Sequence, residues 1–185
     1  MMKRLLLVSL ALLAAASGLM EAQEISVSTN VADYLAGGTL NMEAAYGFAR
    51  HWSVSAGAKY NPFSFGEGED ELLLRQRSFS AGARWWPWHI YSGWWMGAKL
   101  QYQEFGEGGL ADPRTTEGDR YGGGVSAGYS RMLGKHFNLD FGLGLWGGYA
   151  KYTLYQCQTC GRRLSSGSGV FLLPNDFILA VNYIF

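Results

Sequence analysis

Residues 52–61 read Trp-Ser-Val-Ser-Ala-Gly-Ala-Lys-Tyr-Asn, and large or apolar side chains alternate in them with small or polar ones. Successive side chains of a β-strand point to opposite faces, so this period of two predicts a strand with one apolar and one polar face. A strand of this length is long enough to cross a bilayer at a tilt. The same alternation recurs along the chain, most clearly at 40–48, 78–85, 94–102, 137–146 and 177–185.

Two weaker candidate strands, Ile25–Tyr34 and Tyr121–Met132, bring the expected number to eight. An even number of strands returns both ends of a single-chain barrel to one side of the membrane. The expected connections alternate in length, with short ones at 48–51, 87–92 and 134–136 and long ones at 62–72, 105–120 and 153–174. Short periplasmic turns and long outer loops are typical of outer-membrane barrels. The connection Leu35–Gly38 is an exception, because it is short where an outer loop is expected.

The polar face of the expected strands distinguishes a membrane barrel from a soluble one. A soluble barrel turns its apolar face inward, whereas a membrane barrel turns it outward. The polar face here consists mainly of Ser, Gly and Asn with a few charges, which would make a poor dry core but a suitable filling for a narrow membrane barrel. We therefore expect an all-β fold, an eight-stranded antiparallel up-and-down transmembrane β-barrel. A soluble sandwich or lipocalin-like barrel is the alternative.

Composition and aromatic placement agree with this expectation. The chain contains 26 Gly and only 4 Pro, and aromatic residues make up 15% of it. Six aromatic residues surround one expected periplasmic turn: Trp85, Trp86, Trp88, Tyr91, Trp94 and Trp95. Aromatic side chains with a polar tip favour the membrane interface, so this group predicts an interfacial girdle.

The N-terminus has the order of residues of a secretory signal. Lys3 and Arg4 precede an apolar run from Leu5 to Ala16, which is too short to span a bilayer, and small residues follow it. We therefore predict a cleavable signal peptide over residues 1–22 and a barrel over 23–185, although small residues at 16–18 offer another cleavage point. The 15 basic and 15 acidic residues leave no basic excess that would favour nucleic acid.

The C-terminus alternates apolar residues up to a final Phe. This ending resembles the signal that barrel assembly machinery reads on outer-membrane proteins, and we assign that role to Tyr183 and Phe185. We therefore expect the bacterial outer membrane as the location, with its lipids and, during biogenesis, the assembly machinery as partners.

Three segments carry a resemblance to a known family: Tyr60–Phe63, Leu133–Asp140 and Tyr155–Gly161. Together they make the chain similar to a family of uncharacterised small outer-membrane β-barrel proteins best known from Bacteroidetes, over most of the mature chain. The Trp-rich stretch Trp85–Trp88 fits that family only loosely. The resemblance implies a barrel without an assigned activity. Members often occur near genes for fimbria-type surface proteins, which implies a role in cell-surface assembly.

Cys157 and Cys160 form a Cys-x-x-Cys-Gly motif, which is typical of half a zinc site or of a redox pair. A structural metal needs four ligands, but the chain has only two Cys. Its three His, at 51, 89 and 136, are expected at the periplasmic turns, across a barrel of about 25 Å. An oxidising compartment favours a disulfide, and we predict one. A metal half-site shared between chains and a redox-active pair remain the alternatives.

Five charged residues are expected to face the lumen: Glu43, Lys59, Arg84, Lys99 and Asp140. Buried charges must be paired or hydrated, so we predict an internal ionic network. Eight strands leave an interior that side chains fill, which argues against an open channel. Trp95 and Trp146 would narrow the lumen further if they point inward.

The expected positions of the His residues also argue against catalysis. Small outer-membrane barrels that modify lipid use a His with a Ser and an acidic residue near the outer rim. No His is expected at that rim, so the usual general base is missing. We expect no enzyme and no cofactor, but a monomeric barrel with a structural or surface-interaction role through its outer loops Phe63–Glu71, Phe105–Asp119 and Thr153–Leu173. The alternatives are small-solute transport or a channel and, second, a lipid-modifying enzyme.

Overall fold

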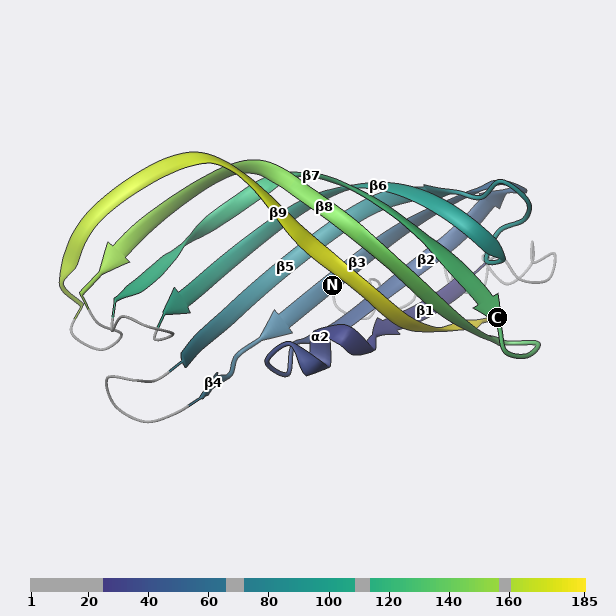
Figure 1. Cartoon of the computed structure of the whole chain (residues 1–185), viewed down its shortest axis with the longest axis horizontal. Helices are drawn as coiled ribbons and strands as arrows, with labels where there is room; N and C mark the ends of the chain where they lie inside the picture. Colours follow the sequence, from purple (N-terminus) through teal and green to yellow (C-terminus); the bar gives the residue numbers. More distant parts are fainter. Residues whose placement is uncertain (1–24, 66–71, 109–113, 157–160) are drawn as a thin grey trace, which may run out of the picture.

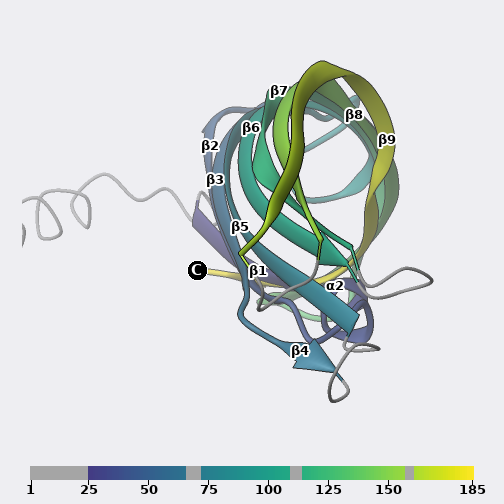
Figure 2. The ribbon, with the colours of Figure 1, turned by 90° about the vertical axis from the view of Figure 1, so that its left-hand side faces the viewer.

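A computed structural model shows the fold and describes residues 25–65, 72–108, 114–156 and 161–185. In this part of the chain, eight antiparallel strands form a closed barrel (Figures 1 and 2). Each strand pairs with its neighbours in the sequence, and β1 also pairs with β9, which closes the sheet. The barrel strands are β1 (Ile25–Asn30), β2 (Leu40–Ala49), β3 (Trp52–Asn61), β5 (Leu72–Trp85), β6 (Gly93–Gly108), β7 (Thr115–Met132), β8 (Phe137–Tyr155) and β9 (Arg163–Ile184). A ninth described strand of two residues, β4 (Ser64–Phe65), pairs with the outer end of β5. The predicted eight-stranded antiparallel barrel is confirmed.

The two faces of the barrel wall have opposite character. Along β3, Val54 and Tyr60 are exposed on the outside, whereas Ser53 and Asn61 are buried inside. The other strands follow the same rule, so apolar side chains cover the outer surface and small or polar ones fill most of the lumen. This distribution is the reverse of that in a soluble barrel. The predicted signal peptide lies outside the described residues.

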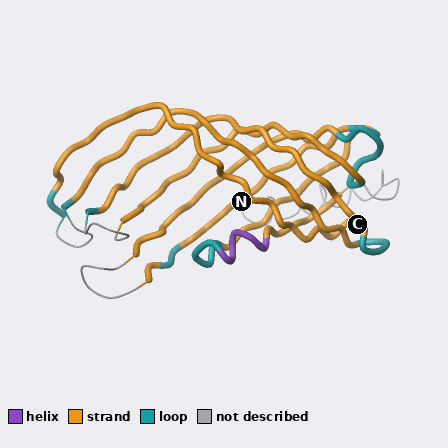
Figure 3. The backbone as a smooth tube through the Cα atoms, viewed as in Figure 1, coloured by secondary structure: helices purple, strands orange, loops and turns teal. Residues whose placement is uncertain are grey.

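The barrel wall is unequal in height. β1, β2 and β3 are short, whereas β6 to β9 continue well beyond them and form a curved extension at one end (Figures 1 and 3). Pairing continues as far as Gly108 with Thr115 and Tyr155 with Arg163. The prediction that 105–120 and 153–174 are loops is therefore wrong for most of their length. Gly, Ser and Thr are frequent in these segments and weaken the alternation, but these residues still form backbone hydrogen bonds with a neighbouring strand.

The expected strand Ile25–Tyr34 ends early. β1 stops at Asn30, and a short helix, α2 (Val31–Leu35), follows it. The Asn30 side chain accepts a hydrogen bond from the backbone N–H of Ala32 at 3.3 Å, which caps the helix. Gly37 and Gly38 then turn the chain back with φ of 75° and 72°, which only glycine adopts at little cost. No helix in the described ranges is long and apolar enough to cross a membrane.

A bulge in β9 changes which side chains face outward. Opposite Gly144–Leu145 of β8, the pairing skips Asn175. One extra residue in a strand exchanges its two faces. Leu172 before the bulge and Phe177 after it are therefore both exposed on the outside. They are five residues apart, and in a regular strand they would point to opposite faces. The bulge keeps the outer surface apolar along the whole of β9.

Candidate functional site in the barrel lumen

Aromatic side chains close the lumen at the end with the short turns. Trp86, Tyr91 and Trp95 are buried there together with Ile184, and we call these four residues the aromatic floor. The ring of Trp86 lies 5.8 Å from that of Tyr91 and 6.3 Å from that of Trp95, measured between centroids. Its indole N–H donates a hydrogen bond to the hydroxyl of Ser53 at 3.0 Å, which satisfies the one polar atom of the ring.

The prediction that all six aromatic residues around this turn form an interfacial girdle is wrong for the three that belong to the aromatic floor. Trp85, Trp88 and Trp94 are exposed, but the other three point inward. Trp86 and Tyr91 point inward because the turn between β5 and β6 is hydrogen-bonded to the neighbouring turn between β2 and β3. The backbone N–H groups of Trp86 and Ile90 donate to the carbonyls of His51 and Arg50 at 2.9 and 3.2 Å. These two bonds hold the turn between β5 and β6 in a position that places Trp86 and Tyr91 inside the barrel.

An ion cluster lies directly on the aromatic floor; we call Arg84, Glu43 and Asp140 the Arg84 cluster. One guanidinium N–H group donates to Glu43 Oε1 at 2.6 Å and another to Asp140 Oδ2 at 3.0 Å. The hydroxyl of Ser130 also donates to Asp140 Oδ1 at 2.5 Å. The guanidinium carbon lies 4.6 Å from the ring centre of Trp95, which adds a cation–π contact. The planar fork of Arg thus joins β2, β5 and β8 through two carboxylates.

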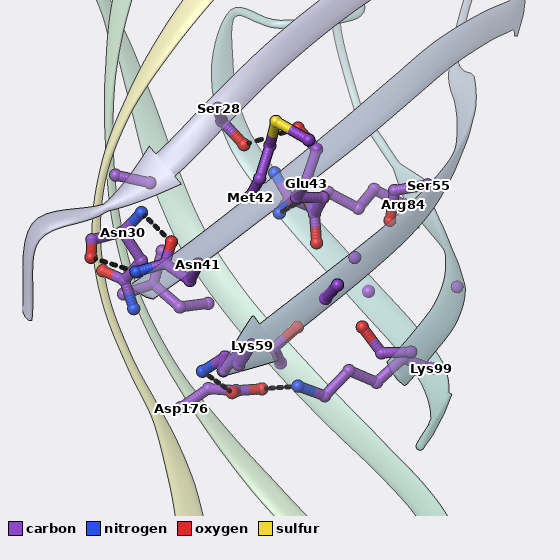
Figure 4. Close-up of a pocket in the computed structure, with 18 of the residues that line it drawn as sticks. Ser28, Asn30, Asn41, Met42, Glu43, Ser55, Lys59, Arg84, Lys99 and Asp176 are labelled. Carbon is purple, nitrogen blue, oxygen red and sulfur yellow. Dashed lines mark hydrogen bonds and ion pairs between the residues drawn. The ribbon is translucent and has the colours of Figure 1, made fainter. Parts of the chain in front are cut away.

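A second ion cluster lies further from the floor; we call Lys59, Lys99, Asp33 and Asp176 the Asp176 cluster. Lys59 from β3 and Lys99 from β6 both approach the Asp176 carboxylate of β9 (Figure 4). Lys99 forms an ion pair with it, and Lys59 Nζ lies 3.8 Å from its Oδ1. Lys59 also pairs with Asp33 Oδ2 at 2.9 Å, which ties α2 to the barrel wall.

All five of the charged residues expected in the lumen lie there, divided between the two clusters. Sequence reasoning missed Asp33 and Asp176. Asp33 lies in a helix where a strand was expected, so its direction could not be read from the alternation. Asp176 could have been found from the sequence. Positions 182, 180 and 178 of β9 point inward, and the same alternation, extended by two residues, places Asp176 inside as well.

A cavity of about 80 Å³ separates the clusters and is lined mainly by small side chains, with those of Ser55, Ser80 and Ser126 among them. A space of this size holds a few water molecules. Beyond it, towards the extension, Gln76 and Gln103 are joined by a hydrogen bond of 2.7 Å. Trp146 also points inward and its ring lies 4.6 Å from that of Phe171. The lumen is therefore narrow and polar in its middle and aromatic towards both ends.

Comparison with known proteins assigns this barrel to a family. The model of a family described as a protein of unknown function, DUF3575, matches residues 8–185. The chain belongs to the DUF3575 family. A search of curated proteins finds no match. The predicted resemblance to an uncharacterised family is confirmed to that extent, whereas its link to Bacteroidetes and the Cys-x-x-Cys-Gly motif stay predictions.

The three His residues of this DUF3575 member lie at the turn end of the barrel. His51 Nδ1 lies 2.8 Å from the carbonyl oxygen of Trp86, and His136 Nδ1 lies 2.9 Å from that of Ile184. Both rings thus hold neighbouring strands or turns together. No group of three His, Cys, Asp or Glu that could hold a metal occurs within the described ranges. Cys157 and Cys160 lie outside those ranges, so the disulfide and its alternatives stay predictions.

The two residues predicted as the assembly signal face outward at the same end. The Tyr183 ring contacts those of Phe137 and Phe185, with centroid distances of 5.2 and 5.0 Å. Both Tyr183 and Phe185 are exposed. An outward aromatic pair at the end of β9 is thus accessible from outside the barrel.

Proposed function

We propose that this protein is exported and inserted in the bacterial outer membrane, where it has a structural or surface-interaction role. The observation that carries the proposal is the reversed wall, with apolar side chains outside and the ion clusters inside. In a bilayer, a closed barrel satisfies all its backbone groups and presents an apolar surface to lipid. The same surface in water would leave an apolar area much larger than monomeric soluble proteins tolerate.

Aromatic side chains at two levels of the outer surface support this location. Near the turn end, the exposed aromatics are Trp52, Trp85, Trp94, Phe137 and Phe185. At the other level they are Tyr60, Tyr102 and Tyr121, which we call the tyrosine level. Aliphatic side chains such as Met96, Leu100 and Val125 are exposed between the two levels. Two aromatic girdles around an aliphatic band are typical of transmembrane barrels.

The contents of the lumen favour a closed barrel over the transport alternative. The aromatic floor and the Arg84 cluster fill the section near the short turns, and the cavity above them holds only a few waters. A solute that passed through would have to displace buried Trp86 and Trp95 and break ion pairs in a narrow space. We propose that the barrel does not conduct.

The placement of His51, His89 and His136 favours a non-enzymatic role. These residues lie at the turn end, away from the extension of β6 to β9. A lipid-modifying barrel needs its general base at the outer rim, and the family description gives no activity. The extension carries exposed charged groups from the tyrosine level outward, with Arg77 Nη1 and Glu104 Oε2 3.7 Å apart. This extension is the surface we assign to interaction at the cell surface.

Two measurements on the refolded protein test the proposal. In detergent, the unheated protein is expected to migrate faster on a gel than the boiled protein, because a closed barrel resists unfolding. In planar bilayers it is expected to give no steady conductance, and Trp86→Ala is expected to raise leakage more than Trp88→Ala, which changes an exposed Trp. The absence of a heat shift would contradict the membrane barrel. Steady conductance of the unaltered protein would instead support a channel.

A further inference from the structure

On one side, β9 has no neighbour among the described strands over much of its length. β8 pairs with β9 from Arg163 to Tyr183, but on the other side β1 pairs only with Ala180–Ile184. The Asn30 side chain covers the next step, because its amide donates to the carbonyl of Phe177 at 3.0 Å and its oxygen accepts from the N–H of Leu179 at 2.8 Å. Beyond Asn30, no described strand pairs with Leu164–Pro174 on the side that faces away from β8. We call this side of the stretch the β9 edge.

Among the described residues, no backbone hydrogen bond from another element reaches the β9 edge, and the neighbouring side chains are exposed. Val170 is 87% and Leu172 72% exposed, more than most other large apolar residues of the chain. A Cβ placed on Gly169 would meet no atom within 4 Å. The backbone groups of this edge are thus open to a ligand.

The opposite edge of the extension, at the outer end of β5, is protected. There the outer end of β5 pairs with the short strand β4 (Ser64–Phe65), through Ser64 with Leu73 and Phe65 with Leu72. β5 also carries Arg75 and Arg77 close to that end. Proteins protect free edges with short covering strands and charged side chains, because a bare edge pairs with other chains. The β9 edge has no charged residue between Arg163 and Asp176.

We propose that the β9 edge binds an extended segment of another protein, which adds one strand to the sheet. A strand edge offers alternating N–H and C=O groups, and an extended polypeptide is the ligand that satisfies them in series. The bound segment is uncharged and carries apolar side chains at alternate positions, next to Val170 and Leu172. This inference rests on the proposed function and names the partner class of its interaction surface.

A second copy of this chain does not fit the β9 edge. Two copies in one membrane point their β9 strands to the same side of it, which excludes antiparallel pairing of the two edges. Barrel strands are also tilted by about 40°, so two β9 strands related by a two-fold axis along the membrane normal cross each other. The partner segment therefore belongs to a different protein and approaches from the outer side.

A random peptide library displayed on phage, selected on the folded protein in neutral detergent, tests the inference. Gly169→Lys places a charge on the β9 edge where the side chain has room, and Gly134→Lys makes the same change at an equally open position in the turn before β8. Selected peptides are expected to alternate apolar residues. They are expected to bind Gly169→Lys at least about tenfold more weakly than the unaltered protein, a loss of about 1.4 kcal/mol, and Gly134→Lys equally well.

Hydrogen exchange then locates the bound peptide. Binding is expected to slow exchange of the amides in Leu164–Leu173 and to leave those of Leu73–Gln76 unchanged. The proposal is overturned if no peptide is selected, if selected peptides bind Gly169→Lys as well as the unaltered protein, or if slowing occurs only elsewhere. A dimer in detergent that Gly169→Lys abolishes would overturn it in favour of a second copy. Each variant is first tested for the heat shift, whose loss in the unaltered protein would count against the membrane barrel and not against the edge.

Discussion

The Arg84 and Asp176 clusters contain similar charges in different surroundings. Arg84 holds two carboxylates directly on the aromatic floor, and the Asp140 side chain is only 2% exposed. All four residues of the Asp176 cluster line the cavity, whereas Asp140 of the Arg84 cluster does not. Lys59 also shares its charge between two carboxylates. Water in the cavity can replace a lost partner anywhere in the second cluster, whereas in the first cluster it reaches Glu43 and Arg84 but not Asp140. We therefore expect the cost of an unpaired charge to depend on access to water more than on the number of ion pairs.

The largest effect is expected for Arg84→Ala. The change leaves Glu43 and Asp140 without their cation, and removing one partner of a buried pair costs about 3–5 kcal/mol of the free energy of unfolding. Urea unfolding in phospholipid vesicles at neutral pH measures the loss. A loss below about 1 kcal/mol would show that water reaches this cluster as freely as the other.

A smaller loss is expected for Asp176→Asn. Lys99 loses its carboxylate partner, and Lys59 keeps Asp33. Leaving a buried polar group without its partner costs about 1–3 kcal/mol, and water in the adjacent cavity reduces the cost. The same unfolding assay applies. If Asp176→Asn destabilised the barrel as much as Arg84→Ala, the proposed difference in water access between the clusters would be wrong.

Asp33→Asn is expected to act mainly on α2. Lys59 stays close to Asp176, so we expect a loss of only about 0.5–1.5 kcal/mol in global stability. Release of the helix from Lys59 is expected to speed hydrogen exchange in Val31–Leu35 by local opening. Faster exchange spread over β3 as well would instead indicate that Asp33 stabilises the wall itself.

The smallest effect is expected for Arg77→Ala. Its ion pair with Glu104, 3.7 Å long, lies on the outside, and more than half of the Arg77 side chain is exposed. Exposed pairs contribute about 0–1 kcal/mol. This variant is the control for the other three, since it also removes a charge from a strand. A loss as large as that of Asp176→Asn would show that the extension supports the barrel below it.

Much of the fold could be predicted because alternation is a local property. The period of two around Lys59 and Lys99 determines which face each residue occupies without knowledge of its neighbours in space. The same reasoning places Glu43, Arg84 and Asp140 inside. It does not say which carboxylate meets which cation, because that depends on the register between strands far apart in the sequence.

The rest could not be predicted because the alternation stops or changes phase. Within the turn that contains Trp86 and Tyr91 the period of two no longer applies, so the sequence does not show that these side chains point inward. The bulge at Asn175 exchanges the faces of β9, and a bulge has no clear signature in a single sequence. Asn30 ends β1 because its side chain caps α2 and also binds the β9 backbone, and the second of these contacts depends on a residue about 150 positions away.

The closure of β1 on β9 has a consequence for the rate of folding. Every other strand pair joins neighbours in the sequence, whereas this seam joins the two ends of the barrel through only five residue pairs, from Ser26 with Ile184 to Asn30 with Ala180. Contacts between distant parts of a chain form slowly, because the entropy of closing a long loop is lost before they contribute. We therefore expect hairpins to form early and the seam to form last. The slow formation of this short seam then sets the lifetime of the open sheet. It also sets how long the sheet is exposed to aggregation before insertion.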